Sequence, residues 1–271
     1  MFMVTEASID VLDWCLDFDG PWSAAAATRF RDGGYSGLKL YGRQDPPPDL
    51  DFVAELPGLK SLYVHAQVPR DTGAFRVDAL VELTLVTGSR QSVPRETTQP
   101  GLRNLCMGWR PGVEVGTHWP GLERLRMLQC AEDCRWLGRA EALRYLEFEG
   151  RGRPGALEGL EACPLLQILK TIRYPVLDSA PLAGLTQLEE VRLLSRPPAP
   201  PHELINLEHL QQAPLRRLWL SGPKVLRGLE TLSVHNSLGD LRLVDYQFSE
   251  DERALVGALP KRIRAGLLDG E

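Results

Sequence analysis

One six-residue pattern recurs along most of the chain: an apolar residue, two residues of any kind, an apolar residue, one residue of any kind and a last apolar residue. A repeat of about 20 to 50 residues is the sequence signature of a solenoid, and it constrains the fold more than composition does. The segments that fit the pattern are LKSLYV (59–64), LVELTL (80–85), LRNLCM (102–107), LERLRM (122–127), LRYLEF (143–148), LEEVRL (188–193), LRRLWL (215–220) and LGDLRL (238–243).

The spacing between repeats is nearly constant. When these segments and ILKTI (168–172) are aligned from Leu62 in the first to Leu241 in the last, neighbouring repeats lie 20 to 27 residues apart. Similar steps backward reach GLKLYG (37–42) and CLDFDG (15–20), so we expect about eleven turns. In each turn the alternate residues of one short strand enter the core, and stacked turns form a parallel sheet with loops or short helical turns opposite it.

The sequence therefore resembles the leucine-rich-repeat proteins over roughly residues 10–246. The resemblance implies an α/β fold, a curved solenoid with a parallel β-sheet on its concave face and short helices, 3-10 turns and loops on its convex face. One departure from the family pattern is that the Asn or Cys expected after each strand is almost absent, which implies irregular turns that are bonded by other means. The residues at that position are Gln67, Gly88, Arg110, Cys130, Arg151, Tyr174, Arg196, Pro223 and Tyr246.

We expect one solenoid domain over residues 1–271, in which residues 15–246 form the repeats. Residues 1–14 and 247–271 are expected to cap the two ends, because an uncovered end would expose its apolar cross-section. Ser249 and Glu252 have the spacing of a capping box, which predicts a short helix that ends before Pro260. The apolar residues expected to cover the last turn are Ile263, Leu267 and Leu268.

Composition and charge disfavour several classes of function. Hydrophobic residues make up 43% and charged residues 25% of the chain, as in folded soluble proteins. A net charge of −5 argues against nucleic-acid binding, which needs clustered Lys and Arg, and it favours a basic partner. Charges interrupt every apolar stretch before the length of about 18 residues that a membrane span requires, so no membrane partner is expected.

The cysteine content predicts a reducing environment. Five cysteines are an odd number at scattered positions, which disfavours a disulfide framework. We therefore expect a cytoplasmic protein. We also expect this protein to be monomeric when it is not bound to its partner. Arg outnumbers Lys 26 to 5, and Ala, Gly and Pro are plentiful, which suggests GC-rich coding and a bacterial source.

Known catalytic and metal-binding motifs are missing from the sequence. It contains no phosphate-binding loop, no H-E-x-x-H and no G-x-S-x-G. Cys130 and Cys134 lack the further soft ligands that zinc needs. Glu147 and Glu149 share one predicted strand without an evident partner carboxylate, so an enzyme with an unrecognised site is the less favoured alternative. We expect no catalytic residue, no metal and no cofactor.

The outward strand positions are rich in Tyr, Trp and Arg, the residue types that dominate interface hot spots. Alternation along each strand places these side chains together on the concave face. The residues predicted to bind a partner there are Tyr41, Tyr63, His65, Arg124, Arg126, Tyr145, Glu147, Lys170, Arg192, Arg217, Trp219 and Arg242. The flanking loops are predicted to add Trp109, Arg173 and Asp245.

We therefore interpret the chain as a non-enzymatic module that binds another protein. A small acidic chain of repeats resembles immunity or inhibitor proteins that block a toxin or enzyme, and a basic toxin or enzyme is one candidate partner. An adaptor or scaffold that recruits a substrate to other machinery is equally compatible with the sequence.

Overall fold

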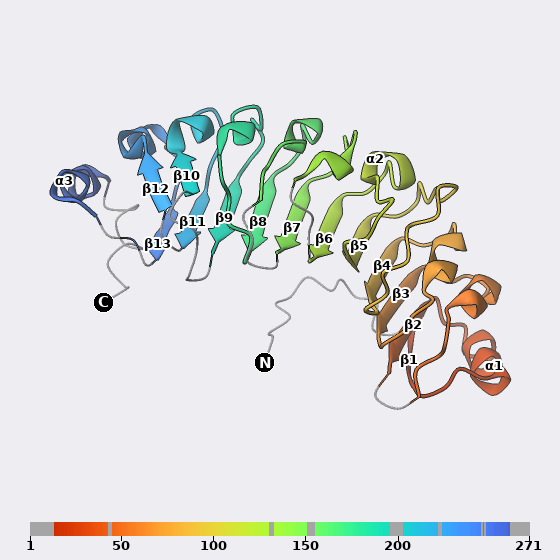
Figure 1. The fold of residues 1–271 in the computed structure, drawn as a ribbon. Helices are drawn as coiled ribbons and strands as arrows, with labels where there is room; N and C mark the ends of the chain where they lie inside the picture. The colour runs from red at the N-terminus through yellow and green to blue at the C-terminus, as the bar shows by residue number, and fades with distance from the viewer. Residues whose placement is uncertain are drawn as a thin grey trace. The chain divides into compact units, whose positions relative to one another are not determined.

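The computed structural model describes residues 14–42, 45–129, 133–150, 155–195, 203–221, 224–244, 246 and 248–260. The chain divides into two compact units, Met1–Gly112 (unit 1) and Val113–Glu271 (unit 2). Each unit contains a parallel sheet built from one strand per turn, with short helical segments on the connections between strands (Figure 1). The single domain expected over residues 1–271 stays a prediction, and the two units are described separately.

Unit 1 contains five strands in the order in which they occur in the chain. Its elements are β1 (Cys15–Asp19), α1 (Ala24–Asp32), β2 (Gly37–Tyr41), η2 (Asp51–Glu55), β3 (Ser61–His65), η3 (Thr72–Arg76), β4 (Glu82–Val86) and β5 (Asn104–Gly108). The register aligns one leucine from every strand, and each of these leucines is buried. They are Leu16, Leu38, Leu62, Leu83 and Leu105.

Unit 2 contains the six remaining strands of the repeats and a small second sheet. The elements of its first part are α2 (Val115–His118), β6 (Arg124–Leu128), η4 (Arg135–Leu137), β7 (Tyr145–Glu149), η5 (Leu160–Ala162), β8 (Ile168–Ile172), η6 (Ala180–Leu182) and β9 (Glu190–Leu194). Those of its second part are β10 (Glu203–Asn206), η7 (Leu207–Leu210), β11 (Arg217–Ser221), β12 (Lys224–Arg227), η8 (Leu229–Val234), β13 (Asp240–Val244) and α3 (Glu250–Ala258). Among the described residues, eleven repeat strands are thus found, one for each expected turn.

The core follows directly from the alternation of side chains. In β11, Leu218 and Leu220 are buried, whereas Arg217, Trp219 and Ser221 lie on the other side of the strand and are exposed or half-buried. Burying one leucine side chain stabilises a fold by roughly 1.5 to 3 kcal/mol, so the inward leucines of successive turns hold each sheet in register. The predicted 3-10 turns are confirmed in η5 and η8.

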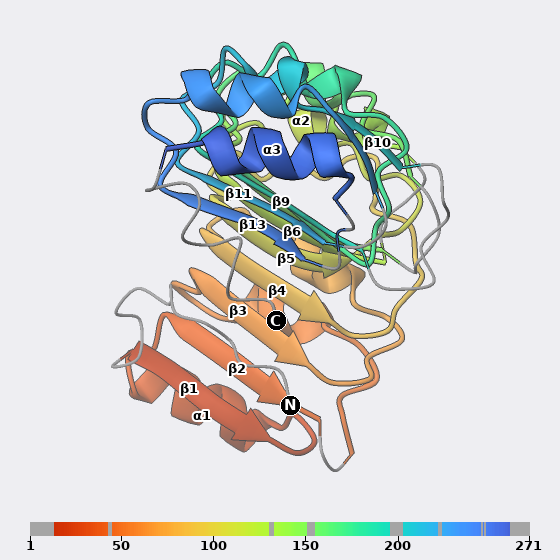
Figure 2. The same ribbon diagram turned by 90° about the vertical axis from the view of Figure 1, so that its left-hand side faces the viewer.

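The parallel pair of β10 and β12 was not predicted from the repeat. These strands lie apart from the repeat strands of unit 2, on the connections that precede β11 and β13 (Figures 1 and 2). Ile205 and Leu226 pair across them, and both side chains are buried. The connection that contains β10 belongs to the longest interval between repeats, which leaves room for a second strand in the turn.

The turns of unit 1 are bonded in the irregular way that the loss of Asn implies. Arg110 and Asp71, which are 1% and 0% exposed, form a two-pronged ion pair with N–O distances of 2.6 and 3.0 Å. The Thr87 hydroxyl donates a hydrogen bond of 2.5 Å to the same carboxylate. The buried Gln99 side chain donates to two backbone carbonyls at 2.9 and 3.2 Å. Side chains from several turns therefore replace a repeated asparagine.

In unit 2, Tyr174 occupies the same position of the repeat, and its hydroxyl donates a hydrogen bond of 2.9 Å to the Ala156 carbonyl. Four further predicted turn residues of this unit lie outside the described residues, namely Cys130, Arg151, Arg196 and Pro223. A side chain other than Asn thus bonds the turn at this position in both units, through Arg110 in unit 1 and Tyr174 in unit 2.

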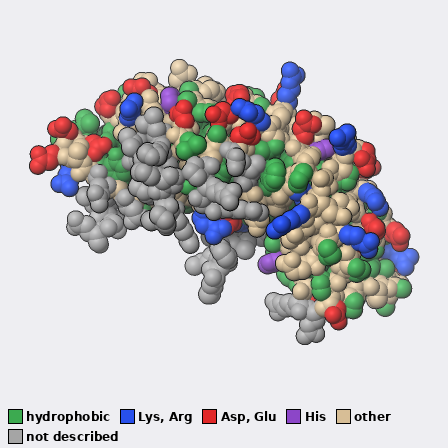
Figure 3. Space-filling view, in the orientation of Figure 1, with side chains coloured by type: hydrophobic (Ala, Val, Ile, Leu, Met, Phe, Trp, Pro, Cys, Tyr) green, Lys and Arg blue, Asp and Glu red, His purple; other side chains and the backbone are tan. Residues whose placement is uncertain are grey.

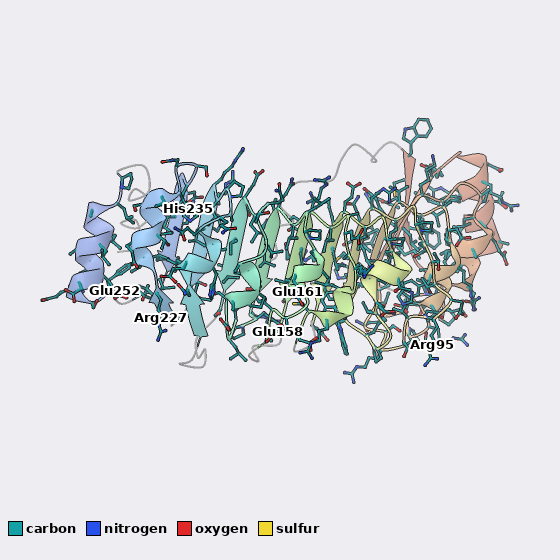
Figure 4. All side chains as sticks on the ribbon, turned by 90° about the horizontal axis from the view of Figure 1, so that it is seen from above. Arg95, Glu158, Glu161, Arg227, His235 and Glu252 are labelled. Carbon is teal, nitrogen blue, oxygen red and sulfur yellow. The ribbon has the colours of Figure 1, made fainter. Side chains whose placement is uncertain are left out.

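The predicted C-terminal helix is present as α3. Ser249 and Glu252 form the expected capping box, and the helix ends at Ala258, two residues before Pro260. Figure 4 shows Glu252 on this helix, and Figure 2 shows the helix beside the last turn of unit 2. The expected covering residues Ile263, Leu267 and Leu268, and nearly all of the expected cap at residues 1–14, lie outside the described residues.

Candidate functional site

The register of unit 2 sorts its outward side chains into three rows that cross the six strands; together these rows are called the unit 2 strand face. The first row is Arg124, Tyr145, Ile168, Glu190, Arg217 and Asp240. The central row is Arg126, Glu147, Lys170, Arg192, Trp219 and Arg242. The third row is Leu128, Glu149, Ile172, Leu194, Ser221 and Val244.

Trp219 lies between two arginines in the central row. The guanidinium carbon of Arg192 is 3.7 Å from a ring centroid of Trp219, and that of Arg242 is 4.1 Å away. The register causes this arrangement, because Arg192 and Arg242 occupy the positions beside Trp219 on the two neighbouring strands. Cation–π contacts of this kind contribute about 0.5 to 2 kcal/mol each, so the three side chains form an ordered block.

Glu190 lies beneath the cations of the same region. Its side chain is only 8% exposed, and its carboxylate oxygens are 3.5 Å from Lys170 Nζ, 2.6 Å from Arg192 Nε and 3.1 Å from Arg217 Nη1. A carboxylate so far from solvent needs paired charges, and this one is shared by cations from β8, β9 and β11. Glu190 therefore positions three side chains of the unit 2 strand face.

A second cluster occupies the opposite end of this face. The Tyr145 ring has the guanidinium carbon of Arg124 at 4.5 Å and Lys170 Nζ at 5.0 Å from its centroid. The Tyr145 hydroxyl donates a hydrogen bond to Glu147, whose other oxygen is 2.9 Å from Arg126 Nε. Burial and the hydrogen bond to Glu147 raise the pKa of Tyr145, so the phenol stays neutral at physiological pH.

The flanking residues predicted from sequence fall in different places. Arg173 follows β8 with a left-handed backbone (φ 51°), and its Nη2 is 3.0 Å from the carboxylate of Glu149 in the third row. Trp109 belongs to unit 1, where it follows β5 and is 36% exposed. Asp245 lies outside the described residues.

The strand face of unit 1 differs in character. The rings of Tyr41 and Tyr63 lie 5.8 Å apart between centroids, and His65 is 6.4 Å from Tyr63. Asp17 forms an ion pair of 3.7 Å with Lys39 on the neighbouring strand. The structure thus brings Tyr41, Tyr63 and His65 of the predicted set together in unit 1. In unit 2, it brings the predicted arginines together with Tyr145 and Trp219.

Every strand residue predicted to bind a partner occupies an outward position, three in unit 1 and nine in unit 2. The strands therefore place these side chains as the alternation required. Their role in binding stays a prediction.

Polar clusters elsewhere serve the turns. The Ser179 hydroxyl is 3.0 Å from His209 Nδ1 and accepts a hydrogen bond of 2.8 Å from the Asn206 backbone, yet Ser179 is fully buried. It stabilises the connection between two turns and does not face solvent. Among the described residues, no group of three or more His, Cys, Asp or Glu side chains is placed to hold a metal ion. No helix in this part of the chain has the length and apolar character to cross a membrane.

One comparison with a solved structure agrees with this architecture. A scan against protein-family models gave no match, and neither did a search of curated protein sequences. Among solved structures, an internalin (inlF) from Listeria monocytogenes is similar, with a TM-score of 0.51 and 16% identity over 85% of this chain and 79% of that one. The leucine-rich-repeat ectodomain of the plant membrane receptor kinase GASSHO1/SCHENGEN3 from Arabidopsis thaliana, solved in complex with CASPARIAN STRIP INTEGRITY FACTOR 2, has a TM-score of 0.45 and 14% identity over 86% of this chain and 29% of that one.

The fold is a leucine-rich-repeat solenoid. At these identities the likeness concerns the fold alone, and the functional residues must come from the geometry of this chain. Within this leucine-rich-repeat fold, sequence reasoning left Glu190 out of the predicted binding set, although its carboxylate holds three of the cations together. The sequence contained a pattern that could have predicted this role, because Lys170, Arg192 and Arg217 lie on the strand of Glu190 or on its two neighbouring strands.

Proposed function

We propose that this protein is a non-enzymatic module that binds a partner protein through the outward faces of its strands. The observation that carries the proposal is the block of Arg192, Trp219 and Arg242. Trp and Arg are the residue types that most often dominate binding energy at protein interfaces. Because these side chains are already ordered by stacking and by Glu190, a partner would lose little further side-chain entropy on contact.

The size of the unit 2 strand face indicates how a partner would use it. Six strands about 4.8 Å apart span about 24 Å, and five residues about 3.3 Å apart span about 13 Å. The projected area is therefore on the order of 300 Å², which is less than half of the roughly 800 Å² that one partner contributes to a standard interface. A folded partner would also need adjoining segments, and we propose that Arg173 contributes there.

Binding alone is compatible with either of two more specific roles. An immunity or inhibitor protein would cover the working surface of a toxin or enzyme, whereas an adaptor or scaffold would leave its partner active and bring it to other machinery. We propose the first role, in the cytoplasm of a bacterium, because the chain is acidic and consists of repeats with scattered cysteines. A loss of partner activity in the complex would distinguish the inhibitor from the adaptor.

The binding function can be tested with a matched pair of double variants. Trp219→Ala with Arg192→Ala removes the stacked block, while Trp14→Ala with Arg253→Ala removes the same residue types outside the unit 2 strand face; Trp14 is 60% exposed and Arg253 is also exposed. Each tagged protein is used to capture partners from the native cell, followed by mass spectrometry. We expect the first pair to lose a partner that the wild type and the control pair retain, with unchanged circular dichroism. Equal capture by all three proteins would refute the proposal.

A further inference from the structure

The unit 2 strand face is layered by charge. Its carboxylates lie lower than its most exposed cations, because the side chains of Glu190, Glu147, Glu149 and Asp240 are 8%, 12%, 22% and 28% exposed. Lys170 and Arg192 lie at a similar depth, with 22% and 20% of their side chains exposed. The most exposed cations stand above them: 43% of the Arg126 side chain, 51% of Arg242 and 55% of Arg217 are accessible. A molecule that approaches this face therefore meets guanidinium groups first, although the chain as a whole has a net charge of −5.

The carboxylates of this face are already paired within the protein. Glu147 pairs with Arg126, Asp240 with Arg242, and Glu190 with three cations, so they neutralise charge from below. These contacts engage one nitrogen of each exposed guanidinium, whereas a guanidinium carries five N–H donors in a planar fork. The remaining donors on the exposed arginines suit incoming carboxylates, which accept such bonds in pairs.

Cations also outnumber carboxylates on this surface, six to four. The cations are Arg124, Arg126, Lys170, Arg192, Arg217 and Arg242, and the carboxylates are Glu147, Glu149, Glu190 and Asp240. On the side of the molecule drawn in Figure 3, acidic and basic side chains are interspersed. On the unit 2 strand face, by contrast, the charged side chains with the greatest exposure are arginines.

The third row gives this face an apolar margin. Leu128, Ile172 and Leu194 are half-buried, and Val244 is 50% exposed. Rows in a sheet that are two residues apart along the strand lie about 7 Å from each other, within reach of neighbouring side chains of one bound segment. Glu149, which is paired with Arg173, and Ser221 interrupt this row. The surface therefore combines cations in two rows with four apolar groups in the third.

We propose that the unit 2 strand face takes an acidic segment of a partner protein that also carries apolar side chains, laid across the strands. This inference rests on the proposed binding function and names the chemistry of the partner. Carboxylates would lie over Arg126, Arg217 and Arg242, and apolar side chains would lie over the third row. The span of about 24 Å matches about seven residues of extended chain or about sixteen residues of helix.

This chemistry fits a protein segment better than a nucleic acid. A polynucleotide presents evenly spaced phosphates, and its affinity depends on neutralising them with many cations. Here, four carboxylates share the surface with six cations, and the apolar row offers nothing to a phosphate backbone. The basic partner that the whole-chain charge favours stays a prediction for other surfaces, such as the strand face of unit 1 with Asp17 and Glu82.

The probe for this proposal is a fluorescein-labelled peptide of about eight residues in which Glu and Leu alternate. Two companions replace every Glu by Gln or by Lys, and a single-stranded oligodeoxynucleotide of similar length represents phosphate binding. Fluorescence anisotropy with the full chain measures each affinity at low and at physiological ionic strength. We expect the Glu peptide to bind most tightly and to weaken as salt screens its charges.

The matched variants are two double substitutions that change net charge equally. Arg217→Gln with Arg242→Gln removes exposed cations from the face, whereas Arg227→Gln with Arg253→Gln removes exposed cations from β12 and α3, and Figure 4 shows Arg227 on β12. Each exposed ion pair contributes modestly, so the first variant should bind the Glu peptide roughly tenfold more weakly. The control should bind within about twofold of the wild type.

The other outcomes overturn the inference in separate ways. Equal weakening by both variants would mean that net charge acts at long range. Equal or tighter binding of the oligonucleotide, lost in the same variant, would make this a phosphate-binding surface. If no peptide binds while Trp219→Ala with Arg192→Ala still abolishes capture of a partner, the acidic segment is refuted and the binding function stands. If no peptide binds and Trp219→Ala with Arg192→Ala does not reduce capture of a partner, both proposals fail.

Discussion

Arg110→Met is expected to destabilise unit 1 strongly, because it leaves the carboxylate of Asp71 buried without its cation. Both side chains of the pair are essentially inaccessible, at 1% and 0% exposure, and two N–O contacts of 2.6 and 3.0 Å join them. Removing one partner of a buried ion pair costs about 3 to 5 kcal/mol in other proteins. The hydrogen bond from Thr87 to Asp71 remains but supplies no positive charge. We therefore expect a loss of about 3 kcal/mol or more in unfolding free energy.

The reasoning is tested by a double-mutant cycle. Asp71→Leu removes the other partner, and the double variant Asp71→Leu with Arg110→Met replaces the pair by apolar groups. Because the apolar pair leaves no buried charge, the double variant should be more stable than the Arg110→Met protein, with a coupling energy above about 1 kcal/mol. Urea unfolding followed by circular dichroism gives the free energies, and hydrogen exchange of the β4 and β5 amides assigns the effect to unit 1. Additive losses in the double variant would refute the account.

Two further predictions concern unit 2. Burial lowers the pKa of His235, although the Ala213 carbonyl opposes the shift by accepting a hydrogen bond. His235 therefore binds a proton more readily in the unfolded chain than in the folded protein. Stability should therefore fall as pH decreases below about 6.5, and His235→Gln should show a smaller difference between the urea midpoints at about pH 7.5 and 5.5; an unchanged difference would contradict this. Ser249→Ala removes the cap of α3 and should weaken amide protection of that helix by about 1 kcal/mol, whereas Ser233→Ala, outside the helix, should leave it unchanged; equal protection in all three proteins would contradict the cap.

The strands could be predicted from sequence because their signal is local and repeated. Leu62 and Val64 alternate with Ser61 and Tyr63, and the same alternation recurs in every turn, so burial on one side determines orientation. The capping box of Ser249 was equally local. By contrast, the pair of β10 and β12 depends on contacts between two connections, and no repeated pattern marks those segments.

The bonds within the site and the turns were harder to predict for a related reason. Arg110 was recognisable as a departure from the family pattern, but its partner Asp71 lies 39 residues away, and many carboxylates are available in the chain. The register did place Arg192 and Arg242 beside Trp219, yet sequence gives no side-chain torsions, so the stacking could not be foreseen. Glu190 was missed because a glutamate on an outward strand position is expected to reach solvent.

The contact of Asp71, Thr87 and Arg110 also limits how this chain can change in length. These residues follow three successive strands, so the bond network joins three turns and depends on their order. In a solenoid with the same asparagine in every turn, one turn can be duplicated or lost while its neighbours still find equivalent partners. Here, removing the turn that carries Thr87 would break the hydrogen bond and change the spacing between Asp71 and Arg110. The three turns that carry Asp71, Thr87 and Arg110 are therefore not interchangeable modules, and a change in their number would break the network.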